Sequence, residues 1–240
     1  MDEITGPQSA YGRGNEKALP LVPSQAPLRA DAQRNRQKVL DAAADILAAQ
    51  GVDGLTMDEL ARSAGVGKGT LYRNFTDKAG IASALLDDRV RDMHARMLQG
   101  PPPLGPGTSG RERLRAFVAA YLDHIARNLD LVLLTESSSP KGRFDRQSYP
   151  FWRRHVEILI TDIWTNGTPE PADANSPEPD LIRTRAEAIL SVLSAAQIDQ
   201  WLHRQGRALD ELIPQLQTIV TAIASRQGPT RRLLHHCDNI

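Results

Sequence analysis

Residues 51–78, GVDGLTMDELARSAGVGKGTLYRNFTDK, decide the fold of the N-terminal part of this chain. The first half predicts a short helix that begins after Thr56. The Thr56 hydroxyl and the Glu59 carboxylate, three residues later, have the spacing of a reciprocal capping box. Gly65 follows the last apolar position, where a left-handed residue commonly ends a helix. A second short helix is expected directly after that turn, so the segment has the pattern of two helices joined by a tight glycine turn.

The second helix combines one apolar face with a polar remainder. Leu71 and Phe75 are four positions apart and are expected to point inward together. Hydroxyl, amide and cationic groups on the second helix of such a pair are typical of a helix that enters the major groove of DNA. The side chains that this arrangement leaves on the outer faces are Lys68, Thr70, Tyr72, Arg73 and Asn74.

These outward side chains suit two different tasks at a DNA surface. The hydroxyls of Thr70 and Tyr72 are suited to phosphate oxygens, which fix the docking angle. Lys68 can reach a phosphate or the O6/N7 edge of a guanine, while Arg73 and Asn74 can contact bases or phosphates. The residue pattern leaves both alternatives open for these three side chains.

Residues at both ends of the second helix also favour a close approach to DNA. Gly67 and Gly69 remove side chains at its start, which lets the backbone come near a ligand. Thr76 is expected to start the next helix, with Lys78 in its first turn. A cation there opposes the helix dipole and therefore indicates a nearby anion, such as a phosphate.

An amphipathic helix over about residues 31–50 is predicted upstream, and a basic cluster lies at its start. Taken alone, such a cluster would be assigned to a solvated helix face. Beside a helix-turn-helix, it is expected to contribute phosphate contacts, which supply most nonspecific affinity for DNA. The cluster consists of Arg29, Arg34, Arg36 and Lys38.

Residues 31–86 resemble the N-terminal DNA-binding domain of the TetR family of bacterial transcriptional regulators. The most specific part is residues 65–81, GVGKGTLYRNFTDKAGI, which has the order Gly-x-x-Lys-Gly-Thr-Leu-Tyr-x-x-Phe-x-x-Lys throughout. Family members often carry Ser or Thr where this chain has Gly67, so one capping hydroxyl is missing here. The resemblance implies phosphate contacts from Thr56, Thr70, Tyr72 and Lys78, base or groove contact from Lys68 and its neighbours, and core positions for Leu71 and Phe75.

The rest of the chain also predicts helices, and no segment alternates long enough for a strand. A Pro/Gly run at residues 100–110 and a proline-rich acidic stretch at residues 167–180 predict loops, and the last two helices are expected at about 180–204 and 207–226. The predicted fold is all-α, with an N-terminal three-helix helix-turn-helix domain and a larger C-terminal helical domain for ligand binding and dimerisation. The expected divisions are a disordered tail at 1–30, the DNA-binding domain at 31–78, the effector and dimerisation domain at 79–228, and a tail at 229–240.

The last two helices have broad apolar faces that need a partner. They could pack on their own domain, or pair with a second copy in a four-helix bundle, and the residue pattern alone leaves both open. The family resemblance implies a homodimer through residues 180–226. Such a dimer can place two related helices about 34–36 Å apart, in successive major grooves of a palindromic operator.

The middle helices carry candidates for a pocket that binds a small-molecule effector. Large apolar and aromatic side chains of this kind are more often core than ligand wall, and structural histidines are commoner than ligand-binding ones. The candidates are Met93, Met97, Phe117, Tyr121, His124, Trp152 and His155.

Composition and motifs narrow the class of protein. The 240 residues include 29 basic and 29 acidic side chains, one cysteine, and no apolar run long enough to cross a bilayer. A cytoplasmic protein without a signal peptide or membrane contact is expected. GVGKGT lacks the preceding strand of a phosphate-binding loop, and no catalytic motif, metal site or cofactor site is predicted. His235, His236 and Cys237 are adjacent soft ligands at the chain end, a weak pattern for metal binding.

These patterns, together with the resemblance to the TetR family, predict a non-enzymatic regulator that binds double-stranded DNA, and the resemblance implies that it responds to a ligand. The favoured form is a homodimeric repressor that binds a palindromic operator and is released by an effector of unknown identity. The alternatives are a transcriptional activator, or a helical sensor that binds a partner without repressing.

Overall fold

A computed structural model describes residues 30–139, 141–146, 148–165 and 179–226. The described part of the chain is all-α, as predicted. The expected tails, most of the 167–180 loop and the residues His235, His236 and Cys237 lie outside it. The helices, in chain order, are α1 (Ala30–Gln50), α2 (Met57–Ser63), α3 (Lys68–Asn74), α4 (Lys78–Gln99), α5 (Gly110–Arg127), α6 (Leu129–Ser137), η1 (Gly142–Asp145), α7 (Tyr149–Thr165), α8 (Pro179–Val192), α9 (Ala195–Asp199), η2 (Gln200–Arg204) and α10 (Leu209–Ala224).

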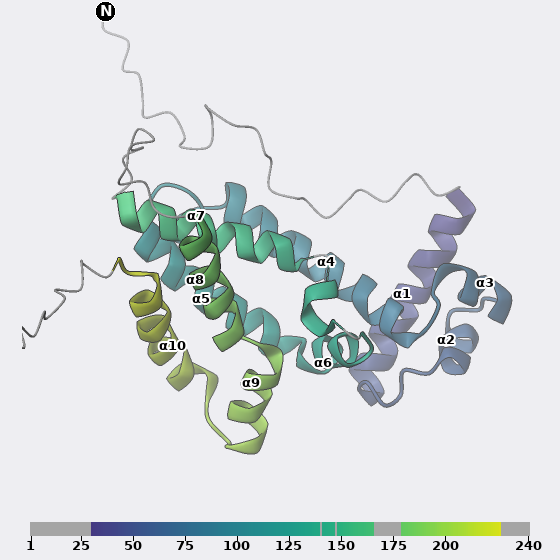
Figure 1. Cartoon of the computed structure of the whole chain (residues 1–240). Helices are drawn as coiled ribbons and strands as arrows, with labels where there is room; N and C mark the ends of the chain where they lie inside the picture. Colours follow the sequence, from purple (N-terminus) through teal and green to yellow (C-terminus); the bar gives the residue numbers. More distant parts are fainter. Residues whose placement is uncertain (1–29, 140, 147, 166–178, 227–240) are drawn as a thin grey trace, which may run out of the picture.

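Figure 1 shows α1, α2 and α3 at one end of the molecule and α5, α7, α8 and α10 at the other. The long helix α4 joins the two ends, because it contacts α1 on one side and α6 on the other. In the larger end, α5 packs against α7 and α10, and α7 packs against α8. The buried apolar side chains form one connected core through both ends. A displacement of α4 would therefore change its contacts with both α1 and α6.

The predicted single helix at 180–204 was wrong. The α8 helix ends at Val192, and α9 begins after Ser194. The Ser194 hydroxyl accepts a hydrogen bond from the Gln197 N–H (3.4 Å), which caps a new helix where the sequence pattern continues the old one. A π-helical turn, η2, follows directly on α9.

The C-terminal end of α10 is fixed to α7 and α8. The indole Nε1 of Trp164 donates to the Ala224 carbonyl (2.7 Å), and the Arg185 guanidinium donates to the Ser225 carbonyl (2.6 Å). Arg185 also lies over the Trp164 ring, 5.2 Å from its centroid. These bonds satisfy carbonyls that a helix end leaves without intrahelical partners, so α10 is held in one register against α7 and α8.

Candidate nucleic-acid interface

The N-terminus of α2 has half of the predicted capping box. The Thr56 hydroxyl accepts from the Glu59 N–H (3.2 Å), as expected for a cap. The returning bond from the Glu59 side chain is not formed, because that carboxylate accepts from the Arg62 guanidinium (2.6 Å). The Thr56 N–H donates instead to the Gly54 carbonyl (2.9 Å).

The turn between α2 and α3 is built as the sequence predicts. Gly65 has a φ of 63°, a left-handed conformation that glycine adopts most readily. The Val66 N–H then reaches back to the Ala61 carbonyl (3.1 Å), which closes the end of α2. Gly67 caps α3 through its backbone alone, since it has no side chain to accept a hydrogen bond. The turn thus joins α2 to α3 through residues 64–67.

The inner face of α3 is packed against α1. Leu71 is fully buried, and Phe75 is 4% exposed, which confirms both predicted core positions. The Arg36 guanidinium carbon of α1 lies 4.6 Å from the centroid of the Phe75 ring, a cation–π contact. Burial lowers the pKa of Arg36, against the opposing effect of nearby Asp87. The structure therefore places Arg36 on Phe75, between α1 and α3, and not with the exposed cations of its predicted cluster.

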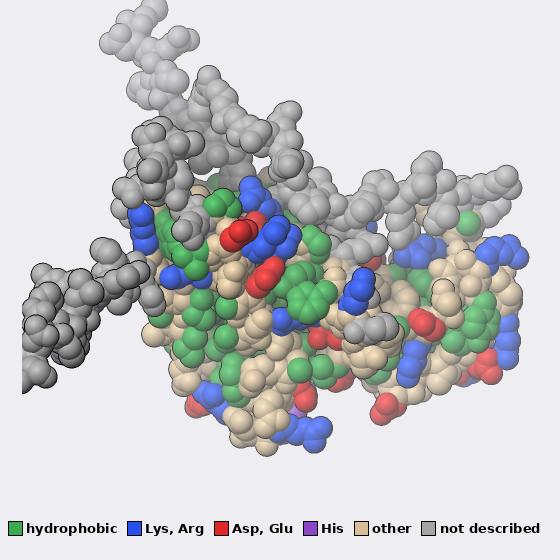
Figure 2. All heavy atoms as spheres, viewed as in Figure 1, with side chains coloured by type: hydrophobic (Ala, Val, Ile, Leu, Met, Phe, Trp, Pro, Cys, Tyr) green, Lys and Arg blue, Asp and Glu red, His purple; other side chains and the backbone are tan. Residues whose placement is uncertain are grey.

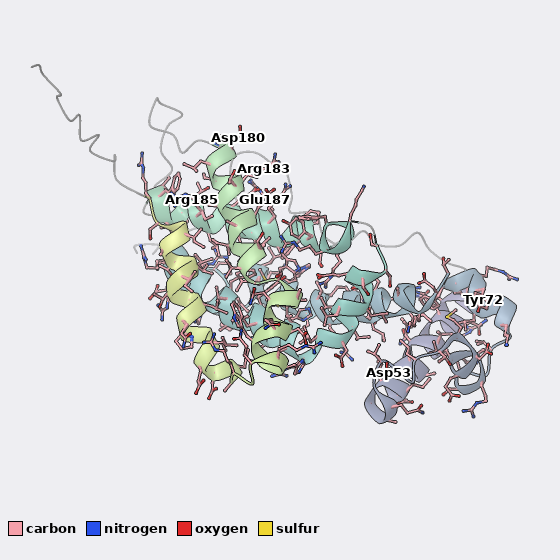
Figure 3. The ribbon with its side chains drawn as sticks, turned by 60° about the horizontal axis from the view of Figure 1, so that its bottom comes forward. Asp53, Tyr72, Asp180, Arg183, Arg185 and Glu187 are labelled. Carbon is pink, nitrogen blue, oxygen red and sulfur yellow. The ribbon has the colours of Figure 1, made fainter. Side chains whose placement is uncertain are left out.

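The outer face of α3 carries the polar side chains that the sequence places there. Tyr72 is 53% exposed, and Figure 3 shows it at the extremity of the molecule. Lys68 and Arg73 are also exposed, and Thr70 is half-buried. The Lys68 Nζ lies 2.8 Å from an Asp58 carboxylate oxygen, and this hydrogen bond raises the pKa of Lys68. Lys68 therefore has an acidic partner on α2.

Asn74 is engaged within α3. Its side-chain Nδ2 donates to the Thr70 carbonyl (2.9 Å), one turn earlier. This bond satisfies a carbonyl near the end of the helix. Because its amide nitrogen makes this bond, the Asn74 side chain has fewer groups available to bind DNA than the sequence analysis expected.

The two glycines at the start of α3 are surrounded by open space. A Cβ atom built on Gly67 or Gly69 would meet no protein atom within 4 Å. Packing inside the protein therefore gives no reason for glycine at either position. Both lie on the exposed entrance of α3.

The first turn of α4 adds a cation to the same end of the molecule. The helix begins at Lys78, which is exposed, after the N-cap Asp77. The Asp77 carboxylate accepts from the Gly80 N–H (2.8 Å), so the N-cap is Asp77 and not Thr76, where the sequence predicted the helix start. On α1, Arg34 and Lys38 are exposed, and Arg34 interacts with other groups of the fold. Figure 2 shows blue cationic side chains around this end, with acidic ones among them.

Residues 39–85 match the model of a family described as bacterial regulatory proteins, tetR family. The HTH-type transcriptional regulator SrpR of Pseudomonas putida is 38% identical over 96 residues, which are 40% of this chain and 42% of SrpR. The chain thus spans less than half of the length of that relative. The HTH-type transcriptional regulator SAR0097 of Staphylococcus aureus (strain MRSA252) is 32% identical over 136 residues, which are 55% of this chain and 69% of SAR0097.

The chain belongs to the TetR family.

The fold agrees with this assignment beyond the N-terminal domain. The FadR protein of Thermus thermophilus, a TetR-family transcriptional repressor solved in complex with lauroyl-CoA, superposes with a TM-score of 0.55. The alignment covers 81% of this chain and 98% of FadR at 17% identity, so it shows a shared fold. TetR-family proteins are transcriptional regulators with an N-terminal helix-turn-helix domain and a helical C-terminal domain, which this chain also has.

The seven residues predicted to line an effector pocket in this TetR-family chain are all buried, and most meet in one aromatic cluster. The Trp152 ring lies 5.5 Å from Tyr121, 6.1 Å from Phe117 and 6.4 Å from His124, measured between centroids. The Phe117 ring lies 5.5 Å from that of His155. The cluster draws these side chains from α5 and α7. Met93 and Met97 lie on α4 and belong to the same buried core.

The structure adds two rings that the sequence analysis missed. His94 of α4 stacks on Phe151 of α7, with centroids 3.5 Å apart, and lies 4.5 Å from Trp152. His94 is 4% exposed and Phe151 is fully buried. The spacing of His94 from Val90 and Met97 on one helical stripe could have revealed it. Arg113 of α5, 6% exposed, is a buried cation at the edge of this region.

The described residues of this TetR-family chain contain neither a membrane-spanning helix nor a group of side chains that could bind a metal ion. No helix there is both long enough and apolar enough to cross a bilayer. Nor do any three histidine, cysteine, aspartate or glutamate side chains of the same residues gather in a way that could hold a metal ion.

Proposed function

We propose that this chain acts in the cytoplasm as a dimeric, ligand-responsive transcriptional repressor, with α3 as its DNA-recognition helix. The observation that carries the proposal is the division of α3 between a buried Leu71 and a Tyr72 that is 53% exposed. A short helix that is anchored on one side and polar on the other is suited to the major groove.

The exposed residues of this end divide into positioning and base-reading groups. Thr56, Thr70, Tyr72 and Lys78 supply hydroxyls and an ammonium group for phosphates. Lys68 and Arg73 are long enough to reach base edges, and Asn74 contributes its remaining amide oxygen. Gly69 lets the backbone of α3 approach the duplex. Arg34 at the start of α1 adds a phosphate contact on the flank.

A homodimer through α8 and α10 is supported by the surface of these helices. Residues 212–225 contain no charged side chain, although part of this stretch is exposed. Leu181 of α8 is 41% exposed and Ile219 of α10 is 47% exposed. Figure 2 shows largely green and uncharged tan surface over α10, whereas charged side chains also lie over α8. Two copies packed as a four-helix bundle would bury the uncharged surface and would place two α3 helices on a palindromic operator.

The effector is proposed to bind in the aromatic cluster of the C-terminal domain. The Thermus FadR complex with lauroyl-CoA supports a small-molecule site in a domain of this fold. The cluster lies between α4, α5 and α7, and α4 contacts α1 of the DNA-binding end. A ligand that binds better to a dimer with wrongly spaced α3 helices shifts the population toward it, and operator affinity falls.

DNA binding can be tested with duplexes selected from a random library, with affinity measured by fluorescence anisotropy at several salt concentrations. Lys78→Ala is expected to weaken binding to every sequence and to reduce the slope of log affinity against log salt by about 1. Lys141→Ala, which removes an exposed lysine between α6 and η1, outside the helix-turn-helix, is the matched control and should change neither quantity. A wild-type protein without salt-dependent DNA binding would refute the proposed function.

A further inference from the structure

Three histidines from three different helices are buried in the aromatic cluster. His94 of α4 is 4% exposed, His124 of α5 is 8% exposed and His155 of α7 is fully buried. Within the described structure, the Nε2 of His94, the Nε2 of His124 and both ring nitrogens of His155 have no hydrogen-bond partner. Buried polar groups are nearly always hydrogen-bonded in proteins, so four such atoms in one cluster are an exception that needs a cause.

Aromatic rings surround these nitrogens on several sides. Phe151 stacks on His94 and is nearly parallel to His155, at an interplanar angle of 4° and a centroid distance of 6.4 Å. Trp152 contacts His94 and His124, and Phe117 contacts His155. The imidazoles are thus polar groups surrounded by the apolar faces and edges of aromatic rings.

The histidines are neutral in this environment. Burial is the main cause that lowers their pKa values, to about 3 for His94, about 4 for His124 and about 3 for His155. A neutral imidazole offers one N–H donor and one acceptor nitrogen. The cluster therefore offers both donors and acceptors but no positive imidazolium. Arg113, the nearby cation, already interacts within the fold.

A small cavity lies beside this cluster and shares two of its residues. Tyr121 and Trp152, two walls of the cluster, also line a cavity beside Glu136, Arg146 and Ser148. The Arg146 guanidinium and the Glu136 carboxylate are 3.6 Å apart there. Trp152 therefore borders both this cavity and the rings of His94 and His124.

We propose that the effector is an uncharged aromatic molecule bearing hydroxyl or carbonyl groups, which hydrogen-bonds to His94, His124 and His155 while its rings pack against Phe117, Phe151 and Trp152. This inference rests on the proposed function, because it names the class of effector for that domain. A saturated acyl chain would bury against the rings but would leave the imidazole nitrogens unpaired. A cationic ligand would find neutral histidines and a repelling Arg113.

The matched probes 2-naphthol and naphthalene test this proposal, since they differ by one hydroxyl group. Isothermal titration of the full chain is expected to show that 2-naphthol binds at least about tenfold more tightly, the value of one good buried hydrogen bond. His155→Phe should reduce this preference several-fold while leaving the melting temperature of the free protein unchanged or raised, because an unpaired buried polar group is removed. His203→Phe, at an exposed histidine of η2, is the control and should leave the preference unchanged.

The outcomes separate the two proposals. Equal binding of both probes, binding of neither, or a His155→Phe protein that melts earlier with its preference intact would overturn the assignment of the effector class. If His155→Phe does not fold, His124→Leu provides the same comparison. A wild-type protein that is released from its operator by lauroyl-CoA but not by 2-naphthol would retain the proposed function and overturn this inference. A wild-type protein that binds no DNA would overturn the proposed function, and a preference of that protein for 2-naphthol over naphthalene would then support the ligand class of the cluster but not its role as an effector site.

Discussion

Gly69 lies at the second position of α3, where no protein atom is within 4 Å of an added Cβ. Alanine is favoured over glycine inside a helix by up to about 1 kcal/mol. Gly69→Ala is therefore expected to raise the free energy of unfolding by up to about 1 kcal/mol, and to weaken DNA binding by holding the helix away from the duplex. Urea unfolding and fluorescence anisotropy measure the two effects.

Gly80→Ala, in the first turn of α4, serves as the comparison for that substitution. Its added Cβ would make only ordinary contact with the Asp77 carboxylate, at 3.7 Å. Gly80→Ala should raise the free energy of unfolding without weakening the affinity for DNA. If Gly69→Ala binds DNA as well as the wild type, the glycine has no role in the approach to DNA.

At the scale of single residues, sequence predicts which side chains face inward better than it predicts their partners. The four-residue spacing of Leu71 and Phe75 correctly separated the two faces of α3. The contacts of Arg36 with Phe75 and of Lys68 with Asp58 join different helices. The geometry of these two contacts depends on how the helices pack against each other. The periodicity of the sequence within one helix carries no information about that packing.

At the scale of elements, the start of α2 depends on one side chain. The Thr56 hydroxyl is the only side-chain cap described for that helix. Thr56→Ala is expected to lower the free energy of unfolding by about 1 kcal/mol, while Thr56→Ser should keep the cap and most of the stability. Urea unfolding curves of both variants test this, and equal stability of the alanine variant and the wild type would contradict it.

Two segments with the same capping spacing behave differently, which shows why element boundaries are only partly predictable. Ser109 and Glu112 at the start of α5 form both bonds of a capping box, at 3.3 and 3.2 Å. Thr56 and Glu59 form only one, because Arg62 takes the glutamate. The break at Ser194 escaped prediction for a related reason, since the apolar periodicity continues through it while its hydroxyl starts a new helix.

At the scale of the whole molecule, Ile219 is the apolar side chain that most clearly needs a covering surface on α10. Ile219→Glu would place a charge in the proposed dimer contact and is expected to shift the protein from dimer to monomer. Light scattering after size exclusion measures the mass of each species. Ala95→Glu, at an exposed position of α4, should leave the dimer intact. A wild-type protein that is monomeric at micromolar concentration would exclude this interface.

The three buried histidines make the molecule sensitive to acid. Their pKa values in the folded state, about 3 to 4, lie below the ordinary value of 6.5. Between these limits the unfolded chain binds more protons than the folded one, so the free energy of unfolding falls as the pH drops below 6.5. Each histidine contributes up to about 1.4 kcal/mol per pH unit.

Urea unfolding as a function of pH tests this expectation. His155→Phe removes one of the three groups and should flatten the dependence between about pH 4 and 6. A stability that does not change in this range would show that the imidazoles are solvated in the folded protein.

The overall architecture could be predicted because long helical stripes and the residues 65–81 motif are local patterns. The composition of the aromatic cluster could be predicted only in part. Phe117, Tyr121 and Trp152 were candidates because large rings lie on apolar helical stripes. The stripe of α4 could also have revealed His94 as a buried residue, but its stacking on Phe151 depends on how α4 packs on α7.

The ion pair between Lys68 and Asp58 has a consequence for how the proposed repressor would find its target. On arbitrary sequence, Lys68 would exchange one anionic partner for another, a phosphate for a carboxylate, and little would be gained. The displaced Asp58 would then lie beside the negatively charged sugar-phosphate chain and would repel it. Encounters with arbitrary sequence would thus be brief, which would let the protein move quickly along the chromosome.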